Sequence, residues 1–212
     1  MEFNSLLKIV GNEPVFEMSL LFAGKTDPAN VRLQLARWVT AGRVIRLRRG
    51  LYSIAPPYNK TRPNPFLVAN RLQPASYVSL QTALAFYGLI PDTVNRVTSV
   101  TAGRPEELNT PLGVYEFRHI KTGLLFGYRS MDVSGQQALV ALPEKALLDM
   151  VYLQSGGESK DYLAELRLQN LDAIDPVRLE QFTGRFGSPK MRTAAKNIIE
   201  LRDAMEGGYS DL

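Results

Sequence analysis

The sequence predicts an α+β protein of 212 residues. Three patterns predict this class: short helical segments before a two-stranded ribbon, alternating strands in the middle of the chain, and proline-initiated helices toward its end. The composition, with 45% hydrophobic and 22% charged residues, is ordinary for globular domains. We therefore expect an N-terminal domain over residues 1–57, a linker over 58–65, and a mixed α/β domain with a helical C-terminal part over 66–212.

The first two helices are expected at residues 3–10 and 16–23, where apolar residues cluster and Gly24 marks the end of the second. A third helix is expected at 29–41. Thr26-Asp27-Pro28 precedes it as a capping residue followed by an early proline, and Gly42 follows it as a stop signal.

The third helix has two different faces. Its core face is expected to hold Val31, Leu35, Trp38 and Val39. Its outer face is expected to hold Asn30, Gln34, Arg37 and Thr40, with Leu33 among them and Arg32 at the boundary. The outer face is therefore polar and basic, with one large apolar residue.

A two-stranded ribbon is expected directly after this helix. Residues 43–47 alternate as a strand, Arg48-Arg49-Gly50 forms a tight turn with glycine at positive φ, and residues 51–54 return as the second strand. Pro56-Pro57 ends the unit. Three helices followed by such a ribbon are typical of a winged helix-turn-helix, in which the third helix enters the DNA major groove.

The distribution of charge favours a nucleic-acid partner for this unit. Residues 1–60 carry nine Lys/Arg and four Asp/Glu, a balance of +5, whereas residues 61–212 carry sixteen and seventeen, a balance of −1. Between Asn30 and Gly50 all six basic residues are arginines and no acid intervenes. Arginine suits bidentate recognition of phosphate and guanine. A solvated basic face and a winged helix that mediates protein contacts remain as alternative interpretations.

Specific DNA contacts can be assigned as expectations. Asn30, Gln34 and Arg37 are candidates for base edges, and Arg46, Arg48 and Arg49 are candidates for phosphate or minor-groove contact, with Arg43 in support. The full set of candidate DNA-binding residues is Asn30, Arg32, Gln34, Arg37, Thr40, Arg43, Arg46, Arg48 and Arg49.

The second region is expected to mix strands and helices. The expected strands cover residues 96–101, 114–120, 124–128 and 138–142. The expected helices cover residues 64–72, 76–89, 143–153, 160–168, 176–186 and 189–205. Pro143, Pro176 and Pro189 stand at first-turn positions of their helices.

Several classes of chemistry are excluded or disfavoured by composition. The chain has no cysteine and a single histidine, His119, which excludes disulfide scaffolds, thiolate metal sites and multi-histidine metal centres. We find no phosphate-binding loop, dinucleotide fingerprint or metalloprotease motif, and therefore expect no cofactor, no metal and no enzymatic activity. The chain also has no secretory signal and no run of about 18 apolar residues, so we expect a cytoplasmic protein without a membrane partner.

The second region offers only weak evidence for catalytic residues. His119 lies in a strand pattern and is expected to be structural. Glu144 and Asp149 are five positions apart, so they do not share a helix face, and Glu144 is expected to act as a favourable first-turn charge. Lys145 beside Glu144 suggests an ion pair at the surface or between elements.

The ordered series of segments resembles the AbiEi family of antitoxins from type IV toxin–antitoxin (abortive infection) systems. The segments RLRRGLY (46–52) and LPEKALLD (142–149) carry most of the resemblance, and PNPFLVANRL (63–72) and VTSVTAGRP (97–105) add to it. The resemblance covers nearly the whole chain from about Val15. It implies a repressor that binds inverted repeats upstream of its own operon through the basic residues of the third helix and ribbon. It also implies a C-terminal domain that counters a nucleotidyltransferase-like toxin without a stable complex.

Three alternatives to this function stay open. The chain could be a nucleic-acid-processing enzyme that uses His119 with Arg118, or Glu144. It could be a stand-alone regulator without a toxin, or a protein-interaction module whose C-terminal helices bind a partner or a second copy. Binding to DNA as a monomer or as a dimer is equally compatible with the sequence.

Overall fold

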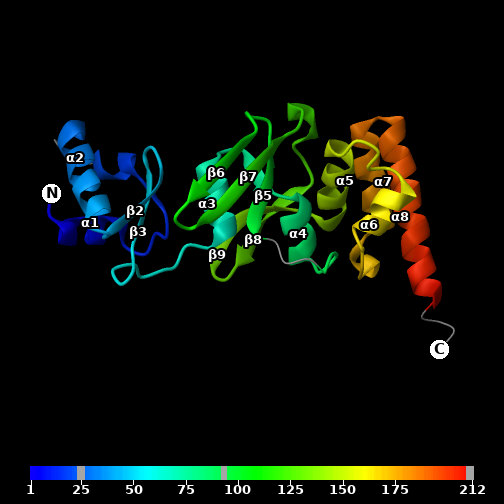
Figure 1. Ribbon diagram of the computed structural model, residues 1–212, viewed down its shortest axis with the longest axis horizontal. Coiled ribbons are helices and arrows are strands. Elements are labelled where there is room, and N and C mark those ends of the chain that lie inside the picture. Colours follow the sequence, from blue (N-terminus) through cyan, green and yellow to red (C-terminus); the bar gives the residue numbers. More distant parts are fainter. Residues whose placement is uncertain (23–26, 92–94, 209–212) are drawn as a thin grey trace.

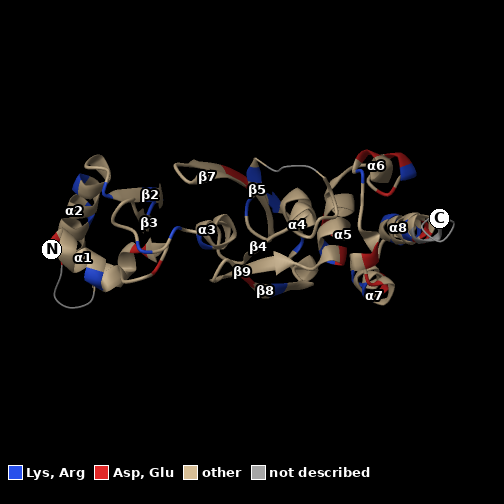
Figure 2. Cartoon of the chain, turned by 90° about the horizontal axis from the view of Figure 1, so that it is seen from below, with Lys and Arg blue, Asp and Glu red and all other residues tan. Residues whose placement is uncertain are grey.

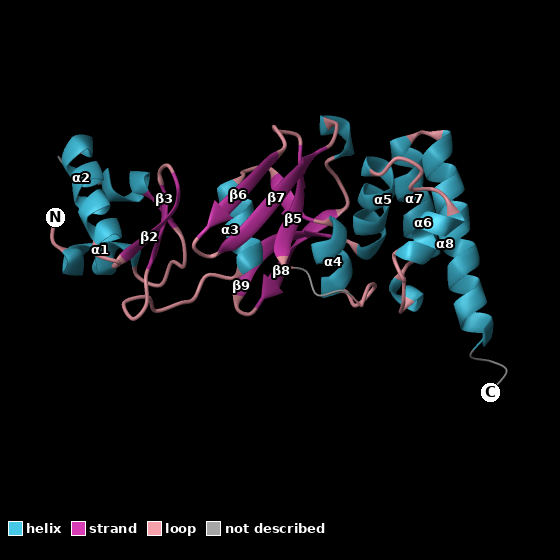
Figure 3. Ribbon diagram, viewed as in Figure 1, coloured by secondary structure: helices cyan, strands magenta, loops and turns pink. Residues whose placement is uncertain are grey.

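The computed structural model describes residues 1–22, 27–91 and 95–208. The molecule is elongated, and three parts follow one another in chain order along its long axis (Figure 1). An N-terminal unit of helices and a small sheet comes first, a larger sheet lies in the middle, and a group of helices forms the other end (Figure 3). The fold is therefore of the α+β class, as the sequence predicts.

The N-terminal unit contains helices on one face of a three-stranded antiparallel sheet of order β1-β3-β2. Its elements are α1 (Phe3–Val10), β1 (Phe16–Glu17), the 3₁₀ helix η1 (Met18–Phe22), α2 (Pro28–Thr40), β2 (Val44–Arg48) and β3 (Leu51–Ile54). Val31, Leu35 and Trp38 of α2 are buried in one cluster with Leu6 of α1 and Val44 of β2. The core face predicted for the third helix is thus confirmed for these three residues, whereas Val39 is only half-buried at its edge.

The helix predicted at residues 16–23 is confirmed only in part, because Met18–Phe22 form a short 3₁₀ helix whereas Phe16 and Glu17 form a strand. Phe16 and Glu17 instead pair with Tyr52 and Leu51 of β3, and the rings of Phe16 and Tyr52 stack with centroids 5.9 Å apart. The backbone N–H of Met18 donates to the carbonyl of Gly50 at 2.8 Å. These contacts with a distant segment satisfy backbone groups that a helix would have satisfied locally. Residue 23, Gly24 and Thr26 lie outside the described residues.

The start of α2 depends on Asp27. Its side chain accepts a hydrogen bond from the backbone N–H of Ala29 at 3.0 Å, and Pro28 is the first helical residue. At the other end Gly42 adopts φ +67°, a conformation that suits glycine after a helix. The helix that carries most candidate contacts is thus delimited by local sequence signals, as predicted.

Replacing Asp27 by alanine is expected to lower the free energy of unfolding by about 1 kcal/mol, because one N–H in the first turn of α2 loses its acceptor. Urea unfolding followed by circular dichroism measures the change. Asp27→Asn is the control, since asparagine keeps the acceptor and should cost much less. Equal losses in the two variants would mean that the charge, and not the hydrogen bond, stabilises the helix.

The central sheet has six strands in the order β6-β7-β5-β4-β9-β8. Its strands are β4 (Ser76–Val78), β5 (Arg96–Thr101), β6 (Glu106–Thr110), β7 (Gly113–His119), β8 (Tyr128–Val133) and β9 (Gln136–Ala141). Two pairs, β4 with β9 and β5 with β7, are parallel, and the other pairs are antiparallel. Helices α3 (Pro65–Leu72) and α4 (Leu80–Phe86) pack against this sheet.

In this region one predicted helix is confirmed only in part, one predicted strand is wrong, and strand β6 was not predicted at all. The helix expected at 76–89 is divided: residues 76–78 form β4 in the interior of the sheet, and the helix begins at Leu80. The strand expected at 124–128 follows a 3₁₀ helix (Thr122–Leu124) and begins only at Tyr128. The missed strand, β6, is a mostly exposed polar edge strand, so it lacks the apolar alternation that marks a strand.

The C-terminal part is helical, as predicted. Its elements are α5 (Pro143–Leu153), α6 (Lys160–Glu165), the 3₁₀ helix η3 (Leu171–Ala173), α7 (Pro176–Phe186) and α8 (Pro189–Gly208). Helices α5 and α7 have the predicted bounds, and each begins with a proline. In the part of the chain that the structure describes, no helix is long and apolar enough to cross a membrane.

The small N-terminal sheet makes buried contacts on both of its faces. Val44 packs into the N-terminal cluster, whereas Leu47 and Leu51 belong to the same buried cluster as the central sheet, together with Val15. All four residues of β3 are buried. The ribbon is therefore held between the helices of its own unit and the second region, and only its turn and one edge carry exposed charges.

Candidate nucleic-acid interface

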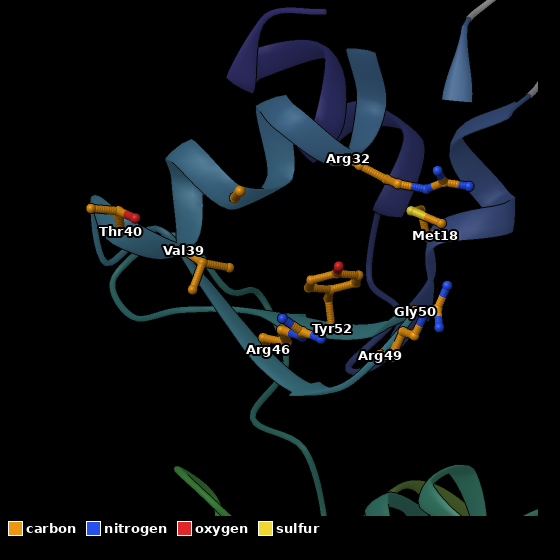
Figure 4. Close-up of a pocket in the computed structure, with 9 residues that line it drawn as sticks. Met18, Arg32, Val39, Thr40, Arg46, Arg49, Gly50 and Tyr52 are labelled. Atoms are coloured by element: carbon orange, nitrogen blue, oxygen red, sulfur yellow. The ribbon is translucent and has the colours of Figure 1, made fainter. Parts of the chain in front are cut away.

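A groove of about 420 Å³ lies between α2 and the face of the small sheet (Figure 4). The residues that line it are Met18, Arg32, Ala36, Val39, Thr40, Arg46, Arg49, Gly50 and Tyr52. Arg32 comes from α2, whereas Arg46 and Arg49 come from the ribbon, so cations stand on both sides of the groove. Met18, Ala36 and Val39 make part of its wall apolar.

The groove is electropositive, because none of its lining residues is acidic. Within the described residues, none of the six arginines between positions 30 and 50 forms an ion pair. Arginines elsewhere differ: Arg96 contacts Glu107 at 2.9 Å and Glu116 at 3.3 Å. Unpaired like charges close together repel one another and attract a polyanion. Figure 2 shows how these charges collect on α2 and the ribbon.

A second hollow, of about 280 Å³, adjoins the groove at the ribbon turn and contains Arg48. Arg49 and Gly50 line both hollows. Gly50 has φ +83°, as expected for glycine in this turn, and a register shift between Arg46 and Arg48 marks a bulge. A bulge changes the direction of side chains along a strand. Arg48 therefore lines this second hollow together with Glu17, Ser19 and Phe22, and it does not line the main groove.

The predicted contact residues divide into two groups. Arg32, Thr40, Arg46 and Arg49 line the groove, whereas Asn30, Gln34, Arg37 and Arg43 do not. Asn30 and Arg37 are exposed on another side of α2, and Gln34 is half-buried there. The Arg43 guanidinium lies 5.3 Å from the centre of the Phe3 ring, next to α1. Of the two arginines on α2, Arg32 therefore shares the groove with the ribbon, and Arg37 does not.

Sequence reasoning missed Tyr52 and Met18 as groove residues. Tyr52 pairs with Arg46 across the ribbon, and the bulge that follows Arg46 sets which side chains share this face. Met18 is brought in by its hydrogen bond to Gly50. Pairing of β2 with β3 could have indicated Tyr52, because directly opposite residues share one face of a sheet. No local signal indicates Met18.

A buried polar cluster lies in the second region, remote from the groove. Lys145 and Asp149 form an ion pair one turn apart in α5, and both side chains are fully buried. Asp149 also accepts hydrogen bonds from the hydroxyls of Tyr77, at 3.0 Å, and Ser79, at 2.8 Å. The Lys145 ammonium stands 4.9 to 5.4 Å from the centres of three rings: Tyr77, Phe126 and Phe186. The prediction of an ion pair at the surface or between elements is therefore wrong for Lys145, whereas Glu144 does pair with Arg178 of another helix.

Burial shifts the pKa values of the groups in this cluster. It lowers the pKa of Lys145 and raises the pKa of Asp149, and the attraction between the two groups opposes both changes. Burial also raises the pKa of Tyr77, and the neighbouring Asp149 carboxylate adds to that effect. The charged side chains of the cluster have no exposed surface, and its contacts join β4 to α5 and to the aromatic side chains of Phe126 and Phe186.

The other catalytic candidates already have partners. Glu144 is fully buried, accepts a hydrogen bond from the N–H of Asp175 at 2.8 Å, and lies 3.5 Å from the Arg178 guanidinium. It is a first-turn residue of α5, as expected, and it also holds the start of α7. The Nδ1 of His119 lies 2.8 Å from the carbonyl oxygen of Gly103. Neither side chain faces the arginine groove.

Comparison with known proteins shows a likeness of fold. No protein-family model matches the chain, and no curated protein matches it. Among solved structures the fold is similar to the crystal structure of the Rv2827c protein from Mycobacterium tuberculosis, with a TM-score of 0.57 and 17% sequence identity. The match covers 92% of this chain and 74% of that chain. This likeness shows that the two chains share a fold over almost the full length of this protein.

Proposed function

We propose that the N-terminal unit is a winged helix-turn-helix that binds double-stranded DNA, with α2 in the major groove and the β2–β3 ribbon on the adjacent backbone or minor groove. The observation that carries the proposal is the acid-free groove in which Arg32 of α2 faces Arg46 and Arg49 of the ribbon. The order of helix, strand, 3₁₀ turn, helix and ribbon supports it as well.

The arrangement of the arginines favours a duplex over a small anion. A single phosphate needs one convergent pocket, whereas exposed arginines here extend from α2 across the groove to the turn at Arg48. Such a spread matches the repeated phosphates of a nucleic-acid backbone. A helix and a projecting ribbon on one surface also match the two grooves of B-form DNA.

The finer role rests on the resemblance to AbiEi antitoxins. On that basis we propose that the DNA is the control region of the protein's own operon, which the protein represses, and that the second region counters a nucleotidyltransferase-like toxin without a stable complex. Under this proposal the protein is a regulator and not an enzyme.

The proposal predicts a strong dependence of DNA affinity on salt. If about five arginines neutralise phosphates, the logarithm of the association constant should fall with the logarithm of salt concentration at a slope of about −4 to −5. Fluorescence anisotropy titrations at several salt concentrations measure this slope. The probes are the duplex upstream of the gene and a scrambled duplex of equal length.

The two duplexes separate specific recognition from general attraction. Preferential, salt-sensitive binding to the upstream duplex supports a regulator of its own operon. Equal and salt-sensitive binding to both duplexes would remove the autoregulator from the proposal and leave a general DNA-binding surface. A slope near zero would contradict the arginine interface itself.

A further inference from the structure

The side of α2 that faces away from the core carries methyl groups. Val31, Leu35 and Trp38 are buried and define the inner side. A helix turns about 100° per residue, so the opposite arc holds Ala29, Leu33, Ala36 and Thr40. All four residues are exposed. We call Leu33, Ala36 and Thr40 the methyl strip.

Leu33 is the prominent member of this strip. Its exposed fraction is 53%, and among the large hydrophobic residues that the structure describes only Val177 is more exposed. A single exposed leucine on a surface needs no explanation by itself. Here, however, it stands on the helix that the proposed function inserts into DNA, at the centre of the inserted side.

Arginines flank the methyl strip on both sides. Arg32 lies on the side of the groove, where Arg46 and Arg49 continue the positive charge. Arg37 is exposed on the opposite side of the strip, since it follows Leu33 by four residues and lies farther from the groove. An apolar centre between two cationic margins is complementary to a DNA major groove, whose floor carries base edges and whose margins carry phosphates.

We propose that the methyl strip reads the C5-methyl groups of thymine, with Leu33 as the main specificity-determining residue. This inference rests on the proposed function and deepens it. Thymine offers the apolar group in the major groove that alanine, threonine and similar side chains contact. The flanking arginines then contact phosphates and carry affinity without reading sequence. The favoured site is consequently one with thymine at the bases that face Leu33.

Charge decides between DNA and a second copy of the chain as the occupant of this surface. A two-fold contact through the strip would bring Arg32 and Arg37 of one copy close to the same residues of the other copy. Like charges placed opposite one another disfavour such a contact. DNA is instead attracted to the strip, because its phosphates are negative and the flanking arginines are positive.

The test replaces thymine by deoxyuridine, which removes only the C5-methyl group. Duplexes are first selected from a random pool with the full-length protein, and each selected thymine is then replaced by deoxyuridine in turn. At the contacted positions the replacement should weaken binding about fourfold, on the scale of one buried methylene group. Leu33→Ala should lower affinity for the thymine duplex and abolish the difference between the two duplexes.

Two controls make the test specific. Val177→Ala shortens the other strongly exposed aliphatic residue, far from α2 on α7, and should leave the thymine-to-uracil ratio unchanged. Circular dichroism checks that Leu33→Ala keeps the wild-type melting temperature. Analytical ultracentrifugation of wild type and Leu33→Ala checks for self-association through the strip.

The outcomes are distinguishable. Equal affinity for thymine and deoxyuridine duplexes, with binding still dependent on Arg46 and Arg49, would overturn the methyl strip and leave the proposed function intact. Failure to select any duplex whose binding depends on these arginines would overturn the proposed function itself. A change in oligomeric state on Leu33→Ala, with an unchanged thymine-to-uracil ratio, would assign the strip to self-association and overturn the inference.

Discussion

The double charge reversal Arg46→Glu with Arg49→Glu is expected to weaken binding to the upstream duplex by about a hundredfold or more, because each lost charge-assisted hydrogen bond contributes about 1.5–3 kcal/mol. Two carboxylates would in addition face the phosphates from the ribbon side of the groove. The absolute slope of the salt dependence should fall as well, by about one for each phosphate contact that is lost. Fluorescence anisotropy at two salt concentrations measures both effects.

A matched variant controls for net charge. Arg104→Glu with Arg129→Glu changes the charge by the same amount, and both residues are exposed in the second region outside the groove. This variant should retain most of the affinity, because exposed charges beyond a Debye length of about 8 Å are largely screened at physiological salt. Equal losses in the two variants would mean that net charge, and not the groove, determines binding.

The protein with Arg46→Glu and Arg49→Glu should still fold. Arg46 and Arg49 are exposed and have no acidic partner in the described part of the chain, so their replacement breaks no ion pair there. It also relieves repulsion among like charges. An unchanged melting temperature together with lost DNA binding would therefore locate the effect in the interface. Lost binding with a lowered melting temperature would contradict this account of the groove.

Replacing Lys145 by methionine is expected to destabilise the protein by about 3–5 kcal/mol, because Asp149 would then be a buried charge without its partner. Methionine keeps a similar length, so the loss of charge and not of volume dominates. Urea unfolding at pH 7, followed by circular dichroism, measures the difference. Adding Asp149→Asn should restore part of the stability, since asparagine removes the charge and still offers an acceptor to Tyr77 and Ser79.

The stability of the Lys145→Met variant is expected to decrease as pH rises. Burial already raises the pKa of Asp149, and loss of Lys145 removes the main influence that lowers it. The folded variant should therefore bind a proton more tightly than the unfolded chain, so its stability is greatest at acid pH. Stability should then decrease as pH rises toward the raised pKa, by up to about 1.4 kcal/mol for each pH unit. A variant whose stability rises with pH over this range would contradict an unpaired buried Asp149.

Lys196→Met is the matched control for Lys145→Met. Lys196 pairs with Glu200 at 3.7 Å with the same spacing in a helix, but its side chain is 76% exposed. Exposed pairs of this kind contribute little, because water and salt screen them. The control should change stability far less than Lys145→Met. Similar losses in both variants would show that the spacing within the helix, and not burial, determines the value of the pair.

Features that depend on neighbouring residues could be predicted from the amino-acid pattern alone. The bounds of α5 and α7 follow from first-turn prolines, the beginning of α2 follows from Asp27 and Pro28, and the ribbon turn follows from Gly50. The concentration of arginines in the first sixty residues is likewise a property of the sequence. These signals act within a few residues, and a linear pattern therefore reports them.

Features that depend on partners far away in the chain could not be predicted in this way and became visible in the folded molecule. Residues 16–17 and 76–78 became strands because β3, β5 and β9 supply backbone partners that no local pattern encodes. The pairing of Lys145 with Asp149 matched a common surface spacing, but packing of the sheet and α7 over α5 removed water and made it a buried pair. The groove formed because the ribbon brings Arg46 and Tyr52 opposite α2. Contacts between segments far apart in sequence, and the water they exclude, set these outcomes.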